Sequence, residues 1–325
     1  MNARSSRYSF VMNRAQRSNT LDNKAQAQVP GTGLLGLARD ALMLMRVHHW
    51  QKNILVFVPM LVSREFGMAS LGASITAFLA FSLAASSAYV LNDLIDAEAD
   101  RLHQFKRERP IARGAISRAV AIGLILGLAV AAFAVAALLP IEFVVVLGVY
   151  YCATCLYSVI VKRMLGLDVV VLALLYTLRV IAGDEAIGSD SSEWIIAFSL
   201  FFFLALALVK RFTELSYLLD AGGTRAPSRA YRVEDLRVMV PLAAASGFSA
   251  ITIFTRFIGS EDVLLTYSHP ERLWYIAPVL IYWLIRLMLL ANRLKVRDDP
   301  VVYATGDLKS LLCGGAVAGI LVWAW

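Results

Sequence analysis

Charged residues are scarce in this sequence. Only 17% of its 325 residues are Asp, Glu, Lys or Arg, whereas a soluble domain carries about 25%. Hydrophobic residues make up 59%, and the mean hydropathy is +0.66. Long runs without charge exclude an ordinary soluble domain and indicate a membrane protein.

Cysteine is also rare, and its three copies exclude a disulfide framework. Cys152 and Cys155 form a C-x-x-C inside an apolar run, without a neighbouring His or charge. We favour a packing role over a redox or metal role for this pair.

The N-terminal segment has no apolar core, so it does not resemble a secretory signal. It contains five Lys or Arg among Ser, Asn and Gln. We predict a basic, disordered cytoplasmic tail over residues 1–38, followed by a membrane domain over residues 39–325. Contact of the tail with anionic lipid is the alternative.

Nine apolar runs approach the length of about 20 residues that crosses a bilayer. We therefore predict an all-α, polytopic membrane protein with nine transmembrane helices. The runs are residues 50–66, 70–91, 119–139, 141–161, 168–186, 194–219, 240–257, 273–293 and 308–325.

The basic residues predict the orientation. Residues 1–53, 92–118, 162–167, 210–238 and 293–309 hold 26 of the 31 Lys and Arg residues. Cytoplasmic segments of membrane proteins carry such an excess, so we expect a cytoplasmic N-terminus and all of these segments on the same side. The same bias accounts for the net charge of +7 without nucleic acid as a partner.

Acidic residues gather at the end of the second run, in the sequence N-D-L-I-D-A-E-A-D. Asn92, Asp93, Asp96 and Asp100 are spaced by three or four residues, which puts them on one helical stripe. Oxygen ligands beside a hydrated surface are typical of Mg²⁺ bound together with phosphate. A solvated acidic helix end is the alternative, which the helix dipole disfavours.

Basic residues follow this stripe at once. Lys106, Arg109 and Arg113 would hold a polyanion from the side opposite the metal. Lys106 is equally compatible with a topology signal. Arg109 and Arg113 flank a Pro-containing turn before Gly114, which favours a phosphate-binding role.

The run N-D-x-x-D-x-x-x-D with Lys106, Arg109-Pro110 and Gly114 resembles the UbiA superfamily of intramembrane prenyltransferases. The resemblance implies nine helices around a central cavity, with aspartates and Mg²⁺ binding a diphosphate. It would make residues 39–325 the catalytic domain. Many members carry a second acidic pair, whereas this chain has only Asp168 in the matching region.

Three further segments resemble the decaprenyl-phosphate phosphoribosyltransferase branch: residues 46–53 (R-V-H-H-W-Q-K-N), 157–162 and 209–215. The branch implies transfer of 5-phosphoribose from phosphoribosyl pyrophosphate to a polyprenyl phosphate, with release of pyrophosphate, for cell-envelope glycan synthesis. It implies a bacterial inner (plasma) membrane enzyme whose active site faces the cytoplasm. Oligomeric state stays open, a homo-oligomer included.

The predicted site follows from the stripe and the resemblance together. Asp93, Asp96 and Asp100 would act through Mg²⁺, with Asn92 as a fourth ligand, and Asp168 would hydrogen-bond ribose hydroxyls. Arg179 is an intramembrane charge and hence a candidate site residue, with a structural pair to Asp168 as its alternative. The predicted substrate-binding residues are Lys52, Asn53, Asn92, Lys106, Arg109, Arg113, Tyr157, Lys162, Arg179, Lys210, Arg211 and Glu214.

Two other functions remain open. A prenyltransferase would move a polyprenyl group from its diphosphate to an aromatic or other acceptor, as the first motif alone would favour. A transporter also has many helices and intramembrane charges. Against a transporter, the charges gather at one face, and no inverted repeat is visible in the sequence.

Overall fold

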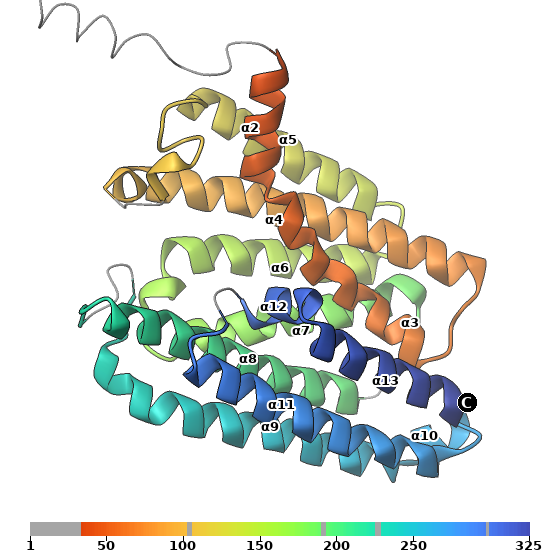
Figure 1. Ribbon diagram of the computed structural model, residues 1–325. Coiled ribbons are helices and arrows are strands. Elements are labelled where there is room, and N and C mark those ends of the chain that lie inside the picture. The colour runs from red at the N-terminus through yellow and green to blue at the C-terminus, as the bar shows by residue number, and fades with distance from the viewer. Residues whose placement is uncertain (1–33, 103–105, 190–192, 225–228, 297–298) are drawn as a thin grey trace, which may run out of the picture.

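The computed structural model describes residues 34–325 apart from 103–105, 190–192, 225–228 and 297–298 (Figure 1). Every element of this part of the chain is helical, which confirms the all-α prediction. Residues 1–33 of the predicted tail lie outside the described residues. The first helix, α2, begins at Leu34, before the predicted domain boundary at residue 39.

The elements follow one another along the chain as α-helices with short 3₁₀ helices (η) between them. They are α2 (Leu34–Met45), η1 (Val47–Phe57), α3 (Val58–Val62), α4 (Met68–Arg101), η2 (Lys106–Glu108), α5 (Arg118–Ala136), α6 (Ile141–Val159), η3 (Val161–Arg163), α7 (Leu167–Ile187), α8 (Glu193–Asp220), η4 (Val233–Asp235), α9 (Leu236–Ile258), α10 (Glu261–Thr266), η5 (Pro270–Tyr275), α11 (Ile276–Asn292), α12 (Pro300–Gly306) and α13 (Leu308–Ala324).

Among the described residues, six helices are long and apolar enough to span a membrane. A seventh span results if α12 and α13, which meet at 89°, are counted together. The predicted number of nine is therefore not confirmed. The first predicted run folds as η1 and the five-residue α3 instead of one helix, and α7 carries charges including Asp168 and Arg179.

The long helices run side by side, with α2 crossing α4 at one edge (Figure 1). Helix α4 has 34 residues and is therefore about 51 Å long, whereas the hydrocarbon core of a bilayer is about 30 Å thick. Its last turns, which carry the acidic stripe, can extend beyond the apolar region. The C-terminal ends of α4, α6, α8 and α11 lie at the same end of the bundle (Figure 1).

Helix α7 packs unusually close to η1. A Cβ atom added to Gly183 of α7 would lie 2.1 Å from the carbonyl oxygen of Val56. No side chain larger than hydrogen fits there without movement of the backbone. Gly183 thus fixes the position of η1, which carries two of the predicted site residues.

We expect Gly183→Ala to destabilise the protein by about 1–3 kcal/mol, because the added methyl group overpacks a backbone contact. Gly148→Ala is the matched control, because a Cβ atom there has no neighbour within 4 Å. That variant should be neutral or more stable, since Ala favours a helix over Gly. Thermal unfolding in detergent measures both, and equal behaviour of the two variants would contradict the close contact.

Candidate functional site

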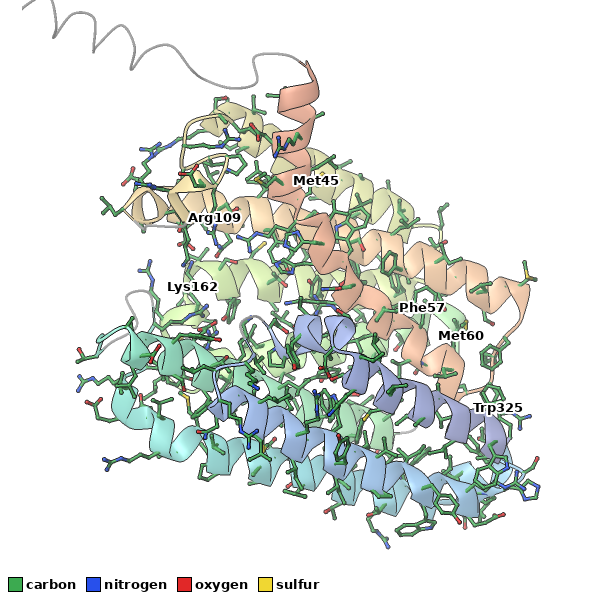
Figure 2. The ribbon with its side chains drawn as sticks, in the orientation of Figure 1. Met45, Phe57, Met60, Arg109, Lys162 and Trp325 are labelled. Atoms are coloured by element: carbon green, nitrogen blue, oxygen red, sulfur yellow. The ribbon has the colours of Figure 1, made fainter. Side chains whose placement is uncertain are left out.

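Asn92, Asp93, Asp96 and Asp100 form the aspartate stripe, and all four lie on α4 as predicted. The structure divides the stripe into two pairs. Arg109 Nη1 lies 3.2 Å from Asp93 Oδ1 and 2.6 Å from Asp100 Oδ2. Figure 2 shows Arg109 and the next basic residue, Lys162, at the same end of the bundle.

Lys162 binds the second pair. Its Nζ donates to Asp96 Oδ1 at 2.8 Å and to Asn92 Oδ1 at 3.2 Å. Lys162 is buried in η3, after the end of α6. The two predicted basic residues Arg109 and Lys162 therefore both reach the aspartate stripe, from different segments.

Arg46 is a further residue of this site, to which the sequence assigned no role. Its Nη2 lies 2.7 Å from Asp93 Oδ1. Arg46 joins α2 to η1 with a left-handed backbone, φ 49° and ψ 49°. The sequence feature that could have identified Arg46 as a site residue is its position at the start of the R-V-H-H-W-Q-K-N motif.

The donor set fits Mg²⁺ in its chemistry. All the candidate ligands are carboxylate or amide oxygens, and Mg²⁺ is commonly held by one or two carboxylates with substrate phosphates and waters. Within the described residues, no group of three or more His, Cys, Asp or Glu side chains is placed to hold a metal. The geometry therefore offers two oxygen pairs, Asp93 with Asp100 and Asp96 with Asn92, in place of one four-residue set.

A second charged group surrounds Asp299, and we call it the Asp299 cluster. Lys52 Nζ and Lys210 Nζ each lie 2.9 Å from Asp299 Oδ2, and the Tyr176 hydroxyl donates at 3.0 Å. Burial alone would raise the pKa of Asp299, but the charges of Lys210 and Lys52 hold it well below its usual range. The sequence suggested only a pre-proline turn here, and Asp298 lies outside the described residues.

Asp168 is buried in a third group, the Asp168 cluster. Arg211 Nε donates to Asp168 Oδ2 at 2.7 Å, and the hydroxyl of Tyr231 donates to Oδ1. Burial and this hydrogen bond raise the pKa of Tyr231. Asp168 is 0% exposed with both oxygens engaged, so in this arrangement it positions Arg211 and Tyr231 and is not placed to touch a ribose.

Tyr157, Arg229 and Glu214 are the remaining members of the Asp168 cluster. The hydroxyl of Tyr157 accepts from Arg211 Nη2 at 2.9 Å and from Arg229 Nη1 at 2.7 Å. Glu214 forms an ion pair with Arg211. Arg229 and Tyr231 were missed from the sequence, although their loop is one of the basic segments.

Arg179 is buried within α7 and does not pair with Asp168, so that structural alternative is wrong. Its Nε donates to Asn53 Oδ1 at 2.8 Å and its Nη2 to the hydroxyl of Tyr150 at 2.9 Å. The guanidinium also lies over the rings of Tyr150 and Tyr176, 4.8 and 5.2 Å from their centroids. Arg179 thereby connects Asn53 to the Asp299 cluster.

Arg113 and Lys106 lie near the stripe in sequence but differ in their contacts. Arg113 forms an ion pair with Asp40 of α2, so the structure does not bring it to the aspartates. Lys106 is half-buried in η2, three residues before Arg109.

Most of the buried cations have an internal carboxylate partner. Lys162 pairs with Asp96, while Lys52 and Lys210 share Asp299. Because of these internal partners, the cations do not by themselves require a substrate anion. Any phosphate must instead exchange with a carboxylate or bind beside it.

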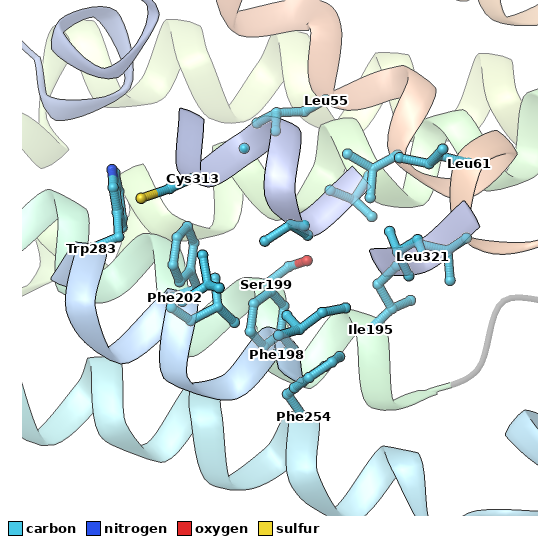
Figure 3. A pocket seen from close by; sticks show the side chains of 18 of the residues that line it. Leu55, Leu61, Ile195, Phe198, Ser199, Phe202, Phe254, Trp283, Cys313 and Leu321 are labelled. Carbon is cyan, nitrogen blue, oxygen red and sulfur yellow. The ribbon is translucent and has the colours of Figure 1, made fainter. Parts of the chain in front are cut away.

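An apolar cavity of about 460 Å³ lies next to the Asp299 cluster, because Phe203, which lines it, stacks on the ring of Tyr176. Figure 3 shows Phe198, Phe202 and Phe254 among the side chains around it. Three other lining residues, Leu55, Leu206 and Val301, are close in sequence to the charged members of the cluster. Each lies within four residues of Lys52, Lys210 or Asp299. The arrangement is suited to an amphiphile whose anionic end lies at the cluster.

Comparison with known protein families matches residues 54–304 to the UbiA prenyltransferase family. The protein y4nM of Sinorhizobium fredii is 35% identical over 288 residues, which are 88% of this chain. This chain spans only 56% of the length of that relative.

This chain covers a larger share of two relatives that have assigned names. Nodulation protein NoeC of Azorhizobium caulinodans is 31% identical over 271 residues, 82% of this chain and 87% of NoeC. The decaprenyl-phosphate phosphoribosyltransferase of Mycolicibacterium smegmatis is 30% identical over 245 residues, 74% of this chain and 77% of that enzyme.

The fold is similar to that of solved UbiA homologues. A homologue from Archaeoglobus fulgidus bound to GPP and Mg²⁺ has a TM-score of 0.67 at 18% identity, covering 87% of this chain and 99% of the other. A homologue from Aeropyrum pernix has a TM-score of 0.59 at 19% identity, covering 86% and 97%.

Proposed function

This chain belongs to the UbiA prenyltransferase family, and we propose that it transfers 5-phosphoribose from phosphoribosyl pyrophosphate to a polyprenyl phosphate. It is a multi-pass membrane protein of a transferase superfamily. The family assignment favours an enzyme over a transporter. The relatives named decaprenyl-phosphate phosphoribosyltransferase support the choice of donor and acceptor.

The observation that carries the proposal is the presence of two separate cation groups. Arg46, Arg109 and Lys162 surround the aspartate stripe, whereas Lys52 and Lys210 lie in the Asp299 cluster beside the apolar cavity. A prenyl diphosphate has one charged end, which needs one such group. Phosphoribosyl pyrophosphate has two anionic ends, its pyrophosphate and its 5-phosphate, and the lipid phosphate adds a third, so this pair of substrates needs at least both groups.

In this proposal the aspartate stripe and its cations bind the pyrophosphate of the donor. Arg109 and Lys162 would release their carboxylates as the diphosphate arrives and would stabilise the charge that develops on the leaving oxygens. The two oxygen pairs, Asp93 with Asp100 and Asp96 with Asn92, would hold Mg²⁺, which when bound neutralises the pyrophosphate leaving group.

The Asp299 cluster would bind the lipid phosphate. Lys52, Lys210 and the Tyr176 hydroxyl would orient it, with the polyprenyl chain in the apolar cavity. A phosphate monoester is already an anionic nucleophile, so orientation near the anomeric carbon matters more than a general base. The negative charge of Asp299 would prevent an anion from binding there too tightly.

Prenyl transfer is the second candidate function, and a specific observation favours it. The apolar cavity could hold the prenyl group of a diphosphate bound at the stripe, as could be expected from the UbiA homologue bound to GPP and Mg²⁺. The acceptor would then lie at the Asp299 cluster. The two functions differ in whether the donor carries a sugar phosphate.

Binding measurements on lysine variants test the proposal. We expect Lys162→Ala to weaken phosphoribosyl pyrophosphate binding by about tenfold or more, since a charge-assisted bond at the stripe is lost. Lys210→Ala should weaken polyprenyl phosphate binding by a similar factor and the donor by less. Calorimetry with Mg²⁺ measures both; the reverse pattern would contradict the assignment of the two sites.

The orientation is also a proposal: the end of the bundle that carries the stripe faces the cytoplasm of a bacterial plasma membrane. In a cysteine-free background, an impermeant thiol reagent should label Glu108→Cys only from the cytoplasmic side and Glu271→Cys only from the outside. Both positions are exposed. Labelling of Glu108→Cys from outside would overturn the orientation.

A further inference from the structure

Contacts between residues 46–57 and α4 recur about once in each turn of η1. Arg46 forms its ion pair with Asp93 at the outer end. Further in, Trp50 Nε1 donates to the hydroxyl of Ser86 at 3.0 Å, and one turn later Asn53 donates to the hydroxyl of Ser82.

His49 faces α4 in the same register, but without a polar bond. Its ring lies against Tyr89 of α4, with the centroids 5.6 Å apart, and against the ring of His48 at 4.2 Å. The His49 Nδ1 atom is buried and has no hydrogen-bond partner among the described residues. A buried polar atom without a partner is uncommon and calls for a missing ligand or water.

The position of His49 is between the two anion sites. Its ring neighbour Tyr89 lies one helical turn, about 6 Å, before Asp93 on α4, and Arg46 reaches both residues. On the other side, Lys52 is one turn later on η1 and belongs to the Asp299 cluster. His49 is therefore flanked by residues of both sites, Arg46 at the stripe and Lys52 of the cluster.

The imidazole is neutral here. Burial and the charges of Lys52, His48 and Arg46 lower the pKa of His49 to about 3. A neutral ring can exchange a hydrogen bond with a hydroxyl group but adds no charge beside the anomeric carbon. An isoprenoid carbon chain offers no such group.

We propose that His49 Nδ1 hydrogen-bonds a ring hydroxyl of the transferred pentose and so selects a hydroxylated group over a prenyl group. This inference rests on the proposed function and adds a specificity-determining residue to it. A site built to bond a hydroxyl rejects analogues that lack it, since its own polar atom is then left unpaired. A buried water on Nδ1 is the competing explanation.

The test compares phosphoribosyl pyrophosphate with pyrophosphate, which has the same diphosphate and lacks the pentose and its 5-phosphate; donor analogues that lack a hydroxyl separate these two differences. With Mg²⁺ present, we expect His49→Phe to weaken phosphoribosyl pyrophosphate binding about tenfold and pyrophosphate binding by less than about twofold. His49→Gln, which is neutral and keeps a donor and an acceptor, should restore donor affinity to within about threefold. His48→Phe is the matched control and should change neither ligand, because His48 is exposed.

Equal weakening of both ligands by His49→Phe, or no effect on the donor, would overturn the inference and leave a structural histidine. A measurement on the wild type avoids any folding defect of the variants. Donor analogues that lack the 2- or the 3-hydroxyl should include one that binds about tenfold more weakly; full affinity for both would also overturn it. If the wild type binds a prenyl diphosphate and ignores phosphoribosyl pyrophosphate, the proposed function itself fails.

Discussion

Asp93→Asn, Asp96→Asn and Asp100→Asn should each lower turnover by about 10²-fold or more while the protein remains folded. Each substitution keeps the size of the side chain but removes a charge that the proposed metal and leaving group require. All three side chains lie at the same end of α4, where Arg109 holds Asp93 and Asp100 and Lys162 holds Asp96.

Glu98→Gln is the control for this series. Glu98 is on the same helical segment and makes an exposed ion pair with Arg118, outside the stripe. It should retain activity within about twofold, since exposed ion pairs contribute little. Steady-state rates and thermal midpoints separate loss of function from loss of folding, and activity within about threefold of wild type at any two of the three aspartates would end the metal assignment.

Asp168→Asn should cost about 3–5 kcal/mol of stability, because it leaves the buried guanidinium of Arg211 without its principal buried partner. Glu214→Gln removes the other carboxylate of Arg211, whose side chain is 43% exposed. That control should cost about 1 kcal/mol or less, since solvent screens the pair.

Unfolding by denaturant measures both variants of the Asp168 cluster. A stable Asp168→Asn protein that has lost affinity for phosphoribosyl pyrophosphate would show that Asp168 binds the donor and does not stabilise the fold. It would return Asp168 to the ribose-binding position that the sequence suggested.

The helix pattern and the acidic stripe were predictable because they depend on local spacing. Apolar runs identify most of the long helices, and a period of three or four residues puts Asp93, Asp96 and Asp100 on the same side of α4. The close contact of Gly183 with Val56 of η1 was not predictable, because it joins residues far apart in the chain.

The partners of the charged residues could not be read from the sequence. Lys52 and Asp299 are 247 residues apart in the chain and yet form an ion pair. A charge count showed many cations but could not show that Lys52, Lys162 and Lys210 each have a carboxylate beside them. Tyr231 was overlooked for the same reason, as only the folded chain brings its loop to Asp168.

Turnover with radiolabelled donor tests the central claim most directly. Purified protein in detergent is incubated with Mg²⁺, a polyprenyl phosphate and phosphoribosyl pyrophosphate labelled in the ribose, and both pyrophosphate and labelled lipid are measured. The account predicts that label enters the lipid with one pyrophosphate released per molecule, and that geranylgeranyl diphosphate is not consumed. Consumption of the prenyl diphosphate, with no label transferred from phosphoribosyl pyrophosphate, would contradict it.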